Sequence, residues 1–161
     1  MLRLNRMTDY AMIMLTALAM RDEALVPSAI LAQQTQLNQT TIAKIGKALV
    51  QAGVIVAERG VNGGYRLARP ASEITATQVI EALEGPIALT ACVDGAEEPC
   101  ATQDGCFLSG HWNQVNGAIR GALDEVTLRS LVSSANMIFS QAGPASQASF
   151  QEVPLQSKKV N

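Results

Sequence analysis

The stretch PSAILAQQTQLNQTTIAKIGKALVQAG, residues 27–53, decides the expected fold of this chain. Its first part, SAILAQQT at 28–35, predicts a short helix that begins after a proline, and residues 36–38 form a tight turn. A second helix is expected over 39–52, because Gly53 follows it where helices commonly end. Two short helices joined by such a turn are typical of a helix-turn-helix. The apolar stripe of the second helix consists of Ile42, Ile45, Leu49 and Val50.

The next residues predict a β hairpin. The expected strands are 54–56 and 65–67, and RGVNGG at 59–64 supplies the glycines that a hairpin tip needs. Arg59 and Arg66 flank this tip, where they can contact phosphate or enter a minor groove. A hairpin directly after a helix-turn-helix is a wing, so the order predicts a winged helix; the alternative is a packing unit that binds nothing. The polar side of the second helix carries Thr40, Thr41, Lys44 and Lys47.

Two further helices complete the expected domain over residues 1–86. Thr8 or Asp9 can cap a first helix that runs to about Met20 and is apolar on most faces, as in a central helix. A short helix over 75–83 begins with a capping box, and a glycine and a proline end it. The fold class is therefore mainly α with a small β hairpin.

Residues 109–136 predict a long amphipathic helix that would pair two copies of the chain, because DNA operators repeat with two-fold symmetry. The alternative is that its apolar stripe packs against its own domain. Residues 141–161 are rich in Ser, Gln, Ala and Pro without periodicity, and a disordered tail is expected over 137–161. The stripe consists of Trp112, Val115, Ile119, Leu123, Val126, Leu128, Leu131 and Val132.

Charge is unevenly distributed along the chain, although the formal net charge is only −2. Residues 1–70 hold eight basic and four acidic side chains, whereas residues 71–161 hold four basic and ten acidic ones. A basic amino-terminal half suits a polyanionic partner such as double-stranded DNA. Chance scatter of charges on a solvated surface is the alternative.

All three cysteines lie in the loop expected over residues 87–108, within CVDGAEEPCATQDGC. Cys92, Cys100 and Cys106 cannot all form disulfides within one chain, and thiolates suit iron–sulfur clusters and zinc. An iron–sulfur cluster, a zinc ion and redox-active thiols are all open at this point. Three thiols leave a four-coordinate site one ligand short, and Asp9 or His111, the single histidine, could complete it. Asp9 could instead cap a helix, and His111 could bind no metal.

Other classes of protein find little support in the sequence. No P-loop, dinucleotide-binding pattern or catalytic triad is visible, and one histidine limits acid–base chemistry, so we do not expect an enzyme. The apolar run at 11–20 follows charged residues and is too short to cross a bilayer. We therefore expect a cytoplasmic protein without a membrane partner.

Several segments together resemble the IscR/NsrR-type winged-helix regulators, which are iron–sulfur proteins that control transcription. They are LRLNRMTDYA at the start, RGVNGGYRLARP in the wing, EITATQVIEALEG after it, and the three-cysteine loop followed by HW. EALEGPIALTAC and TDYA most resemble the subgroup of regulators of the SUF iron–sulfur assembly system. The resemblance covers roughly residues 1–135.

The resemblance implies a homodimer that represses iron–sulfur assembly genes and senses cluster status or redox state. It implies a 4Fe–4S or 2Fe–2S cluster bound by the three cysteines. NsrR-like proteins use an aspartate that Asp9 of the partner subunit matches, and IscR-like proteins use a histidine where this chain has Ser109, two residues before His111. A nitric-oxide-responsive cluster repressor and a zinc or thiol redox regulator are the alternatives. The candidate DNA-binding residues are Ser28, Gln39, Thr40, Thr41, Lys44, Lys47, Arg59 and Arg66.

Overall fold

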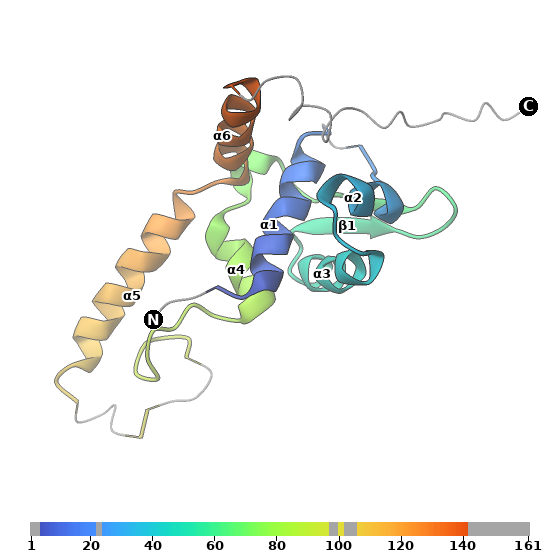
Figure 1. Ribbon diagram of the computed structural model, residues 1–161. Helices are drawn as coiled ribbons and strands as arrows, with labels where there is room; N and C mark the ends of the chain where they lie inside the picture. Colours follow the sequence, from blue (N-terminus) through green and yellow to red (C-terminus); the bar gives the residue numbers. More distant parts are fainter. Residues whose placement is uncertain (1–3, 22–23, 97–99, 102–105, 142–161) are drawn as a thin grey trace, which may run out of the picture.

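The computed structural model describes residues 4–21, 24–96, 100–101 and 106–141, without the side chains of Ser109 and 135–141. Within these residues helices make up most of the fold, and one antiparallel hairpin projects from one side, as the sequence predicts (Figure 1). The elements follow in the order α1 (Arg6–Ala19), α2 (Ser28–Thr35), α3 (Gln39–Gln51), β1 (Ile55–Glu58), β2 (Gly64–Leu67), the 3-10 turn η1 (Ala71–Glu73), α4 (Ala76–Glu84), α5 (Ser109–Asp124) and α6 (Leu128–Gln141). The expected fold class, mainly α with a small hairpin, is confirmed.

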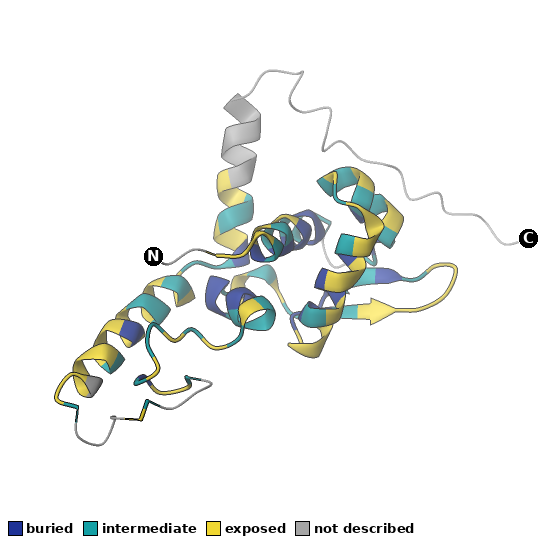
Figure 2. Cartoon of the chain, turned by 60° about the horizontal axis from the view of Figure 1, so that its bottom comes forward, coloured by how far each residue is buried: buried dark blue, intermediate teal, exposed yellow. Residues whose placement is uncertain are grey.

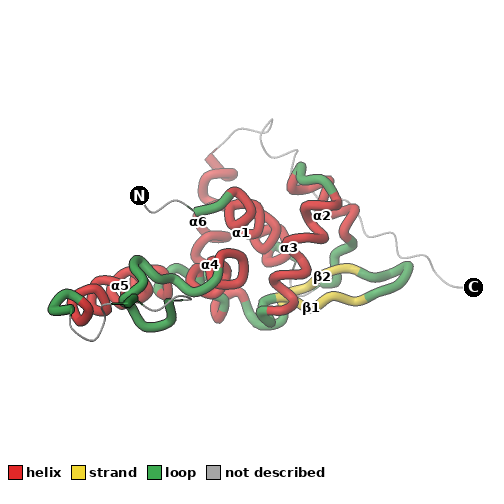
Figure 3. The backbone as a smooth tube through the Cα atoms, turned by 90° about the horizontal axis from the view of Figure 1, so that it is seen from below, coloured by secondary structure: helices red, strands yellow, loops and turns green. Residues whose placement is uncertain are grey.

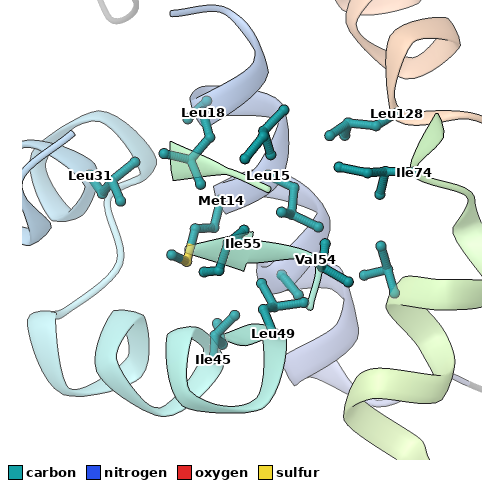
Figure 4. Close-up of a cluster of buried hydrophobic side chains, with 14 of the residues drawn as sticks. Met14, Leu15, Leu18, Leu31, Ile45, Leu49, Val54, Ile55, Ile74 and Leu128 are labelled. Carbon is teal, nitrogen blue, oxygen red and sulfur yellow. The ribbon is translucent and has the colours of Figure 1, made fainter. Parts of the chain in front are cut away.

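Helix α1 is the centre of the core. It contacts α2, α3, α4, α6 and β2, and its residues Met14, Leu15 and Leu18 are buried among side chains from all of them (Figure 4). Aromatic residues make up only 4% of the chain, so aliphatic side chains and methionine fill this core. Their burial removes apolar area from water, which is the main force that holds a small domain together.

The start of α1 differs from the prediction. Asn5 is the cap, since its side chain accepts a hydrogen bond from the Met7 N–H at 2.9 Å. Thr8 is the third residue of the helix, where it is buried and donates its hydroxyl hydrogen to the Glu84 carboxylate instead. Asp9 is exposed in the first turn, where a negative charge is favoured by the helix dipole.

Helices α2 and α3 form the predicted helix-turn-helix. Gln36 adopts the left-handed conformation, with φ of 57°, and Asn38 accepts a hydrogen bond from the Thr41 N–H at 2.7 Å. These two residues end α2 and begin α3 within a very short segment. Val50 does not belong to the buried stripe of α3, because it lies one residue beyond Leu49 and is 38% exposed.

Strands β1 and β2 form the wing. Ile55 pairs with Leu67, and Glu58 pairs with Gly64, so the five residues 59–63 form the tip. The other edge of β2 is bonded to the segment before α2, because the N–H and C=O groups of Tyr65 both bond to Val26 at 2.9 Å. The wing is therefore attached to the helix-turn-helix along a strand edge as well as through the core.

The segment expected as one helix over 109–136 forms two helices instead. Residues 125–127 separate α5 from α6, and the backbone of Thr127 pairs with that of Thr75. Leu128, on the expected apolar stripe, is only 2% exposed and lies in the same core as α1. Helix α6 extends to Gln141, so residues 137–141 are helical rather than part of a tail, and 142–161 lie outside the described residues.

Replacing Leu128 with alanine tests this packing of α6. We expect Leu128→Ala to lower the free energy of unfolding by about 2–5 kcal/mol, because it leaves a cavity in the core. Leu131→Ala is the matched control, since Leu131 is only half-buried on the same helix. Urea denaturation followed by circular dichroism measures both. Equal losses for the two variants would contradict the burial of Leu128 in the core.

Candidate nucleic-acid interface and cysteine loop

The outer face of α3 presents polar and basic side chains to solvent. Thr40, Lys44 and Lys47 are exposed, and they follow one another at helical spacing. Gln39 is exposed at the first position of the helix, whereas Thr41 and Ser28 are half-buried. The buried stripe of the same helix faces the core, so these polar residues point away from the domain. Their arrangement is that of a recognition helix.

A groove lies between α3 and the wing. Lys47 and Val50 line one wall, and Arg59 and Tyr65 line the other. The exposure of Val50, an apolar residue in this groove, leaves an aliphatic contact surface beside two cationic groups. Cationic groups bind phosphate, and apolar side chains contact sugars and thymine methyl groups. The groove therefore joins the recognition helix and the wing into one continuous surface.

The two arginines of the wing have different environments. Arg59 is exposed at the base of the tip, and it forms no ion pair with any residue that the structure describes. Arg66 forms an ion pair with Glu58 at 3.6 Å. It lies on the opposite face of β2 from Tyr65, because side chains alternate along a strand. Arg59 is therefore the better placed of the two for a partner in the groove, and the role of Arg66 in DNA binding stays a prediction.

The first part of the cysteine loop folds back on itself. The Cys100 N–H donates a hydrogen bond to the Ala91 carbonyl at 3.0 Å, which brings the backbone of Cys100 beside the residue that precedes Cys92. The Thr90 hydroxyl lies 3.1 Å from the Cys92 sulfur. All three cysteines are half-buried. The backbone at Ala91, just before the first cysteine, and the backbone at Cys100 therefore lie next to each other.

Two asparagines of α5 anchor this loop. Asn116 is 4% exposed; it accepts a hydrogen bond from the Leu89 N–H at 3.1 Å and donates one to the Ile87 carbonyl at 2.9 Å. One turn earlier, Asn113 accepts from the Asp94 N–H at 2.9 Å and donates to the Asp94 carboxylate at 3.2 Å. The anchors lie on both sides of Cys92 in the sequence, so they fix its position relative to α5.

Sequence reasoning missed this pair of asparagines. They lie three residues apart on one face of α5, but asparagine is also common on exposed helix faces, so only their proximity to the loop could have suggested the role. Sequence reasoning also missed Glu84, which accepts hydrogen bonds from the Asn5 N–H and the Thr8 hydroxyl and so joins the start of α1 to the end of α4.

The candidate metal ligands are not assembled into one group. Among the described residues, no three side chains of His, Cys, Asp or Glu lie together as a metal site. His111 is exposed in the first turn of α5, and Asp9 is exposed in the first turn of α1. The loop begins after α4 ends at Glu84, and α5 begins at Ser109, three residues after Cys106.

The loop and the wing occupy opposite ends of the molecule (Figures 1 and 3). Helix α5 extends away from the winged helix, and much of its surface is exposed (Figure 2). It is fastened to α4 by an ion pair between Arg120 and Glu81 at 3.0 Å and by the hydrogen bond from Thr75 to Asp124 at 3.3 Å. Within the described residues, no helix combines the length and apolar character needed to cross a membrane.

Comparison with known proteins identifies the family. A model of the Rrf2 family, described as iron-dependent transcriptional regulator, matches residues 4–134. The chain is 34% identical over 131 residues to the protein aau3 of Rhizobium meliloti, with 81% of this chain and 85% of that protein covered. It is 31% identical over 143 residues to the HTH-type transcriptional regulator NsrR of Oceanobacillus iheyensis, with 88% and 97% covered.

Two further similarities agree with this result. The HTH-type transcriptional regulator IscR of Serratia proteamaculans is 28% identical over 138 residues, with 85% of this chain and 83% of IscR covered. The solved structure of CymR, the global cysteine regulator of B. subtilis, has a TM-score of 0.63 and 27% identity, with 83% and 98% covered. The exposed recognition helix, the wing and these matches together show that the chain is a DNA-binding transcriptional regulator that belongs to the Rrf2 family.

Proposed function

We propose that two copies of this chain bind a palindromic operator and repress iron–sulfur assembly genes, and that the cysteine loop reports the state of an iron–sulfur cluster. The observation that carries the proposal is the anchoring of the three-cysteine loop to α5, at the opposite end of the molecule from the wing. The target genes rest on the resemblance of the segment around Gly85 to regulators of the SUF system.

The exposed apolar face of α5 supports a dimer. Trp112 is 38% exposed and Val115 is 43% exposed, and they continue toward Ile119 and Leu123, which line a groove beside Leu4. The asparagines of α5 are hydrogen-bonded to the loop. The apolar face of α5 is therefore the face that can bind a partner. Burial of this face against a second copy would place two recognition helices on one duplex.

The donors fit an iron–sulfur cluster by their chemistry. Thiolates are the protein ligands of such clusters, and Cys92, Cys100 and Cys106 would supply three. A bound cluster would supply a redox-sensitive centre that reacts with oxidants or nitric oxide. Asp9 of the partner subunit is the fourth ligand that we favour, because it is exposed at the start of α1, and His111 is the alternative.

The chain offers a physical route from the loop to the DNA-binding surface. A change in the loop acts on α5 through Asn113 and Asn116, and α5 acts on α4 through Arg120. Helix α4 packs against α1 and α3, so a shift of α5 reorients the recognition helix relative to its copy in the dimer. Loss of the correct spacing between half-sites prevents both copies from binding one duplex at the same time.

The DNA-binding part of the proposal predicts that Arg59→Ala weakens binding. The probe is a duplex selected from a random-sequence pool by the wild-type protein. Because one cationic contact with phosphate is lost, the slope of log affinity against log salt should flatten by about one unit. Arg129→Ala, a loss of an exposed arginine on α6, is the matched control and should leave the slope unchanged. A normal slope for Arg59→Ala would exclude the wing contact.

The cluster part of the proposal predicts iron and acid-labile sulfide in comparable amounts after anaerobic purification. Cys92→Ala and Cys106→Ala should lose both and change the affinity for the selected duplex, while circular dichroism shows an intact winged helix. Zinc without sulfide would support a zinc regulator. A colourless protein that resists reconstitution would support a thiol switch. Unchanged DNA affinity in both variants would rule out the loop as a sensor.

The choice of fourth ligand gives a separate prediction. Asp9→Ala should bind a cluster that is lost faster in air than that of the wild type, because one protein ligand is replaced by solvent. His111→Ala should retain wild-type stability, measured as the decay of visible absorption. The two variants are matched, since both side chains are exposed in the first turn of a helix. The reverse result would assign the ligand to His111.

A further inference from the structure

We propose that Tyr65, seated on the backbone of α3 at Gly46, sets the position of the wing relative to the recognition helix, so that Gly46 and Tyr65 are positioning residues for the contact of Arg59 with DNA. This inference rests on the proposed wing contact of Arg59 and on nothing about the cysteine loop.

The contact between Tyr65 and Gly46 is unusually close. A Cβ atom added to Gly46 would lie 2.7 Å from the Cζ atom of Tyr65 and 2.8 Å from its hydroxyl oxygen, closer than real Cβ atoms approach other heavy atoms. Gly46 is buried in the middle of α3, where glycine is a poor helix former. The helix therefore bears a residue that weakens it at the point where the tyrosine ring rests.

Tyr65 is fixed to the rest of the wing by its backbone. Its N–H and C=O groups bond to Val26 at 2.9 Å, and it faces Ala57 in the register of the hairpin. It shares a face of β2 with the buried Leu67, so its ring points toward the helices. A displacement of the ring therefore moves the strand that carries the tip.

The contact between Gly46 and Tyr65 lies inside the DNA-binding groove. Gly46 and Tyr65 both line this groove, together with Lys47 from α3 and Arg59 from the wing. The distance across the groove decides whether Lys47 and Arg59 can meet phosphates of the same duplex at the same time. A larger residue at position 46 widens the groove, and a smaller residue at 65 leaves the wing without its support.

The contact lies at the edge of the core, where Tyr65 packs against the buried cluster. Tyr65 is half-buried, and the clash with a Cβ atom at Gly46 involves the far end of its side chain rather than backbone. The ring and the strand that carries it can shift together toward the groove while the buried stripe of α3 stays in place. Gly46→Ala should therefore fold, with the wing displaced.

The experiment is a double-mutant cycle with the duplex selected by the wild-type protein. In the parent, Arg59→Ala is expected to weaken binding about tenfold, as the loss of a phosphate contact. In the Gly46→Ala background the same change is expected to cost less than about twofold, because the displaced wing no longer makes the contact. A structural role of Gly46 without positioning would leave the two effects additive.

Gly117→Ala is the matched control. It also replaces a helical glycine, on α5, but a Cβ atom there has nothing within 4 Å. Arg59→Ala should cost as much in the Gly117→Ala background as in the parent. The chain has only two tyrosines, so the ring NMR signals of Tyr65 and Tyr10 give a direct readout. Gly46→Ala should shift the Tyr65 signal and leave that of Tyr10.

The outcomes separate this inference from the proposed function. If Arg59→Ala alone has no effect, the wing contact itself is wrong. If Arg59→Ala weakens binding equally with and without Gly46→Ala, the wing contact stands and the positioning role is overturned. If Gly46→Ala does not fold, Tyr65→Leu replaces it in the cycle, because it removes the ring and keeps an apolar side chain. Additivity with Tyr65→Leu would equally overturn the inference.

Discussion

Burial of α1 is the constraint on which the rest of the structure depends. Its inward side chains contact the helix-turn-helix, the wing strand β2, α4 and α6, so one aliphatic core fixes all of these elements relative to one another. Few aromatic residues are available, and close packing of Met14, Leu15 and their neighbours supplies the stability. The recognition helix and the wing are therefore held in place by the core behind them, and their polar side chains face outward.

Helix α5 stands apart from this core and has two distinct faces. Its asparagines hold the cysteine loop by hydrogen bonds to backbone groups, while its apolar side chains, among them Trp112, are left partly exposed. A buried asparagine such as Asn116 is stable only while both of its partners stay in place, since an unpaired buried amide costs about 1–3 kcal/mol. A rearrangement of residues 87–94 must therefore either break these hydrogen bonds or move α5 with it.

Local chemistry explains which parts of the fold the sequence could predict. The helix at 28–35, the capping box of α4 and the glycines of the wing follow from nearby residues, and each prediction is confirmed. Asn5, rather than Thr8, caps α1 because Thr8 is buried against Glu84, which is distant in sequence. The apolar stripe after the loop does not show that α6 packs into the core, because only the structure places Leu128 there.

The same distinction applies to the candidate sites. The residue types that suit DNA and thiolate chemistry could be named from the sequence, because their chemistry belongs to single side chains. Their support could not, because Gly46 beneath Tyr65 and Asn116 beside Leu89 are contacts between elements far apart in the chain. From the sequence alone, a glycine within the recognition helix predicts only a less stable helix, and the structure adds that the Tyr65 ring packs against it. In this protein both the wing and the cysteine loop depend on such a contact, because the wing packs on α3 and the loop is hydrogen-bonded to α5.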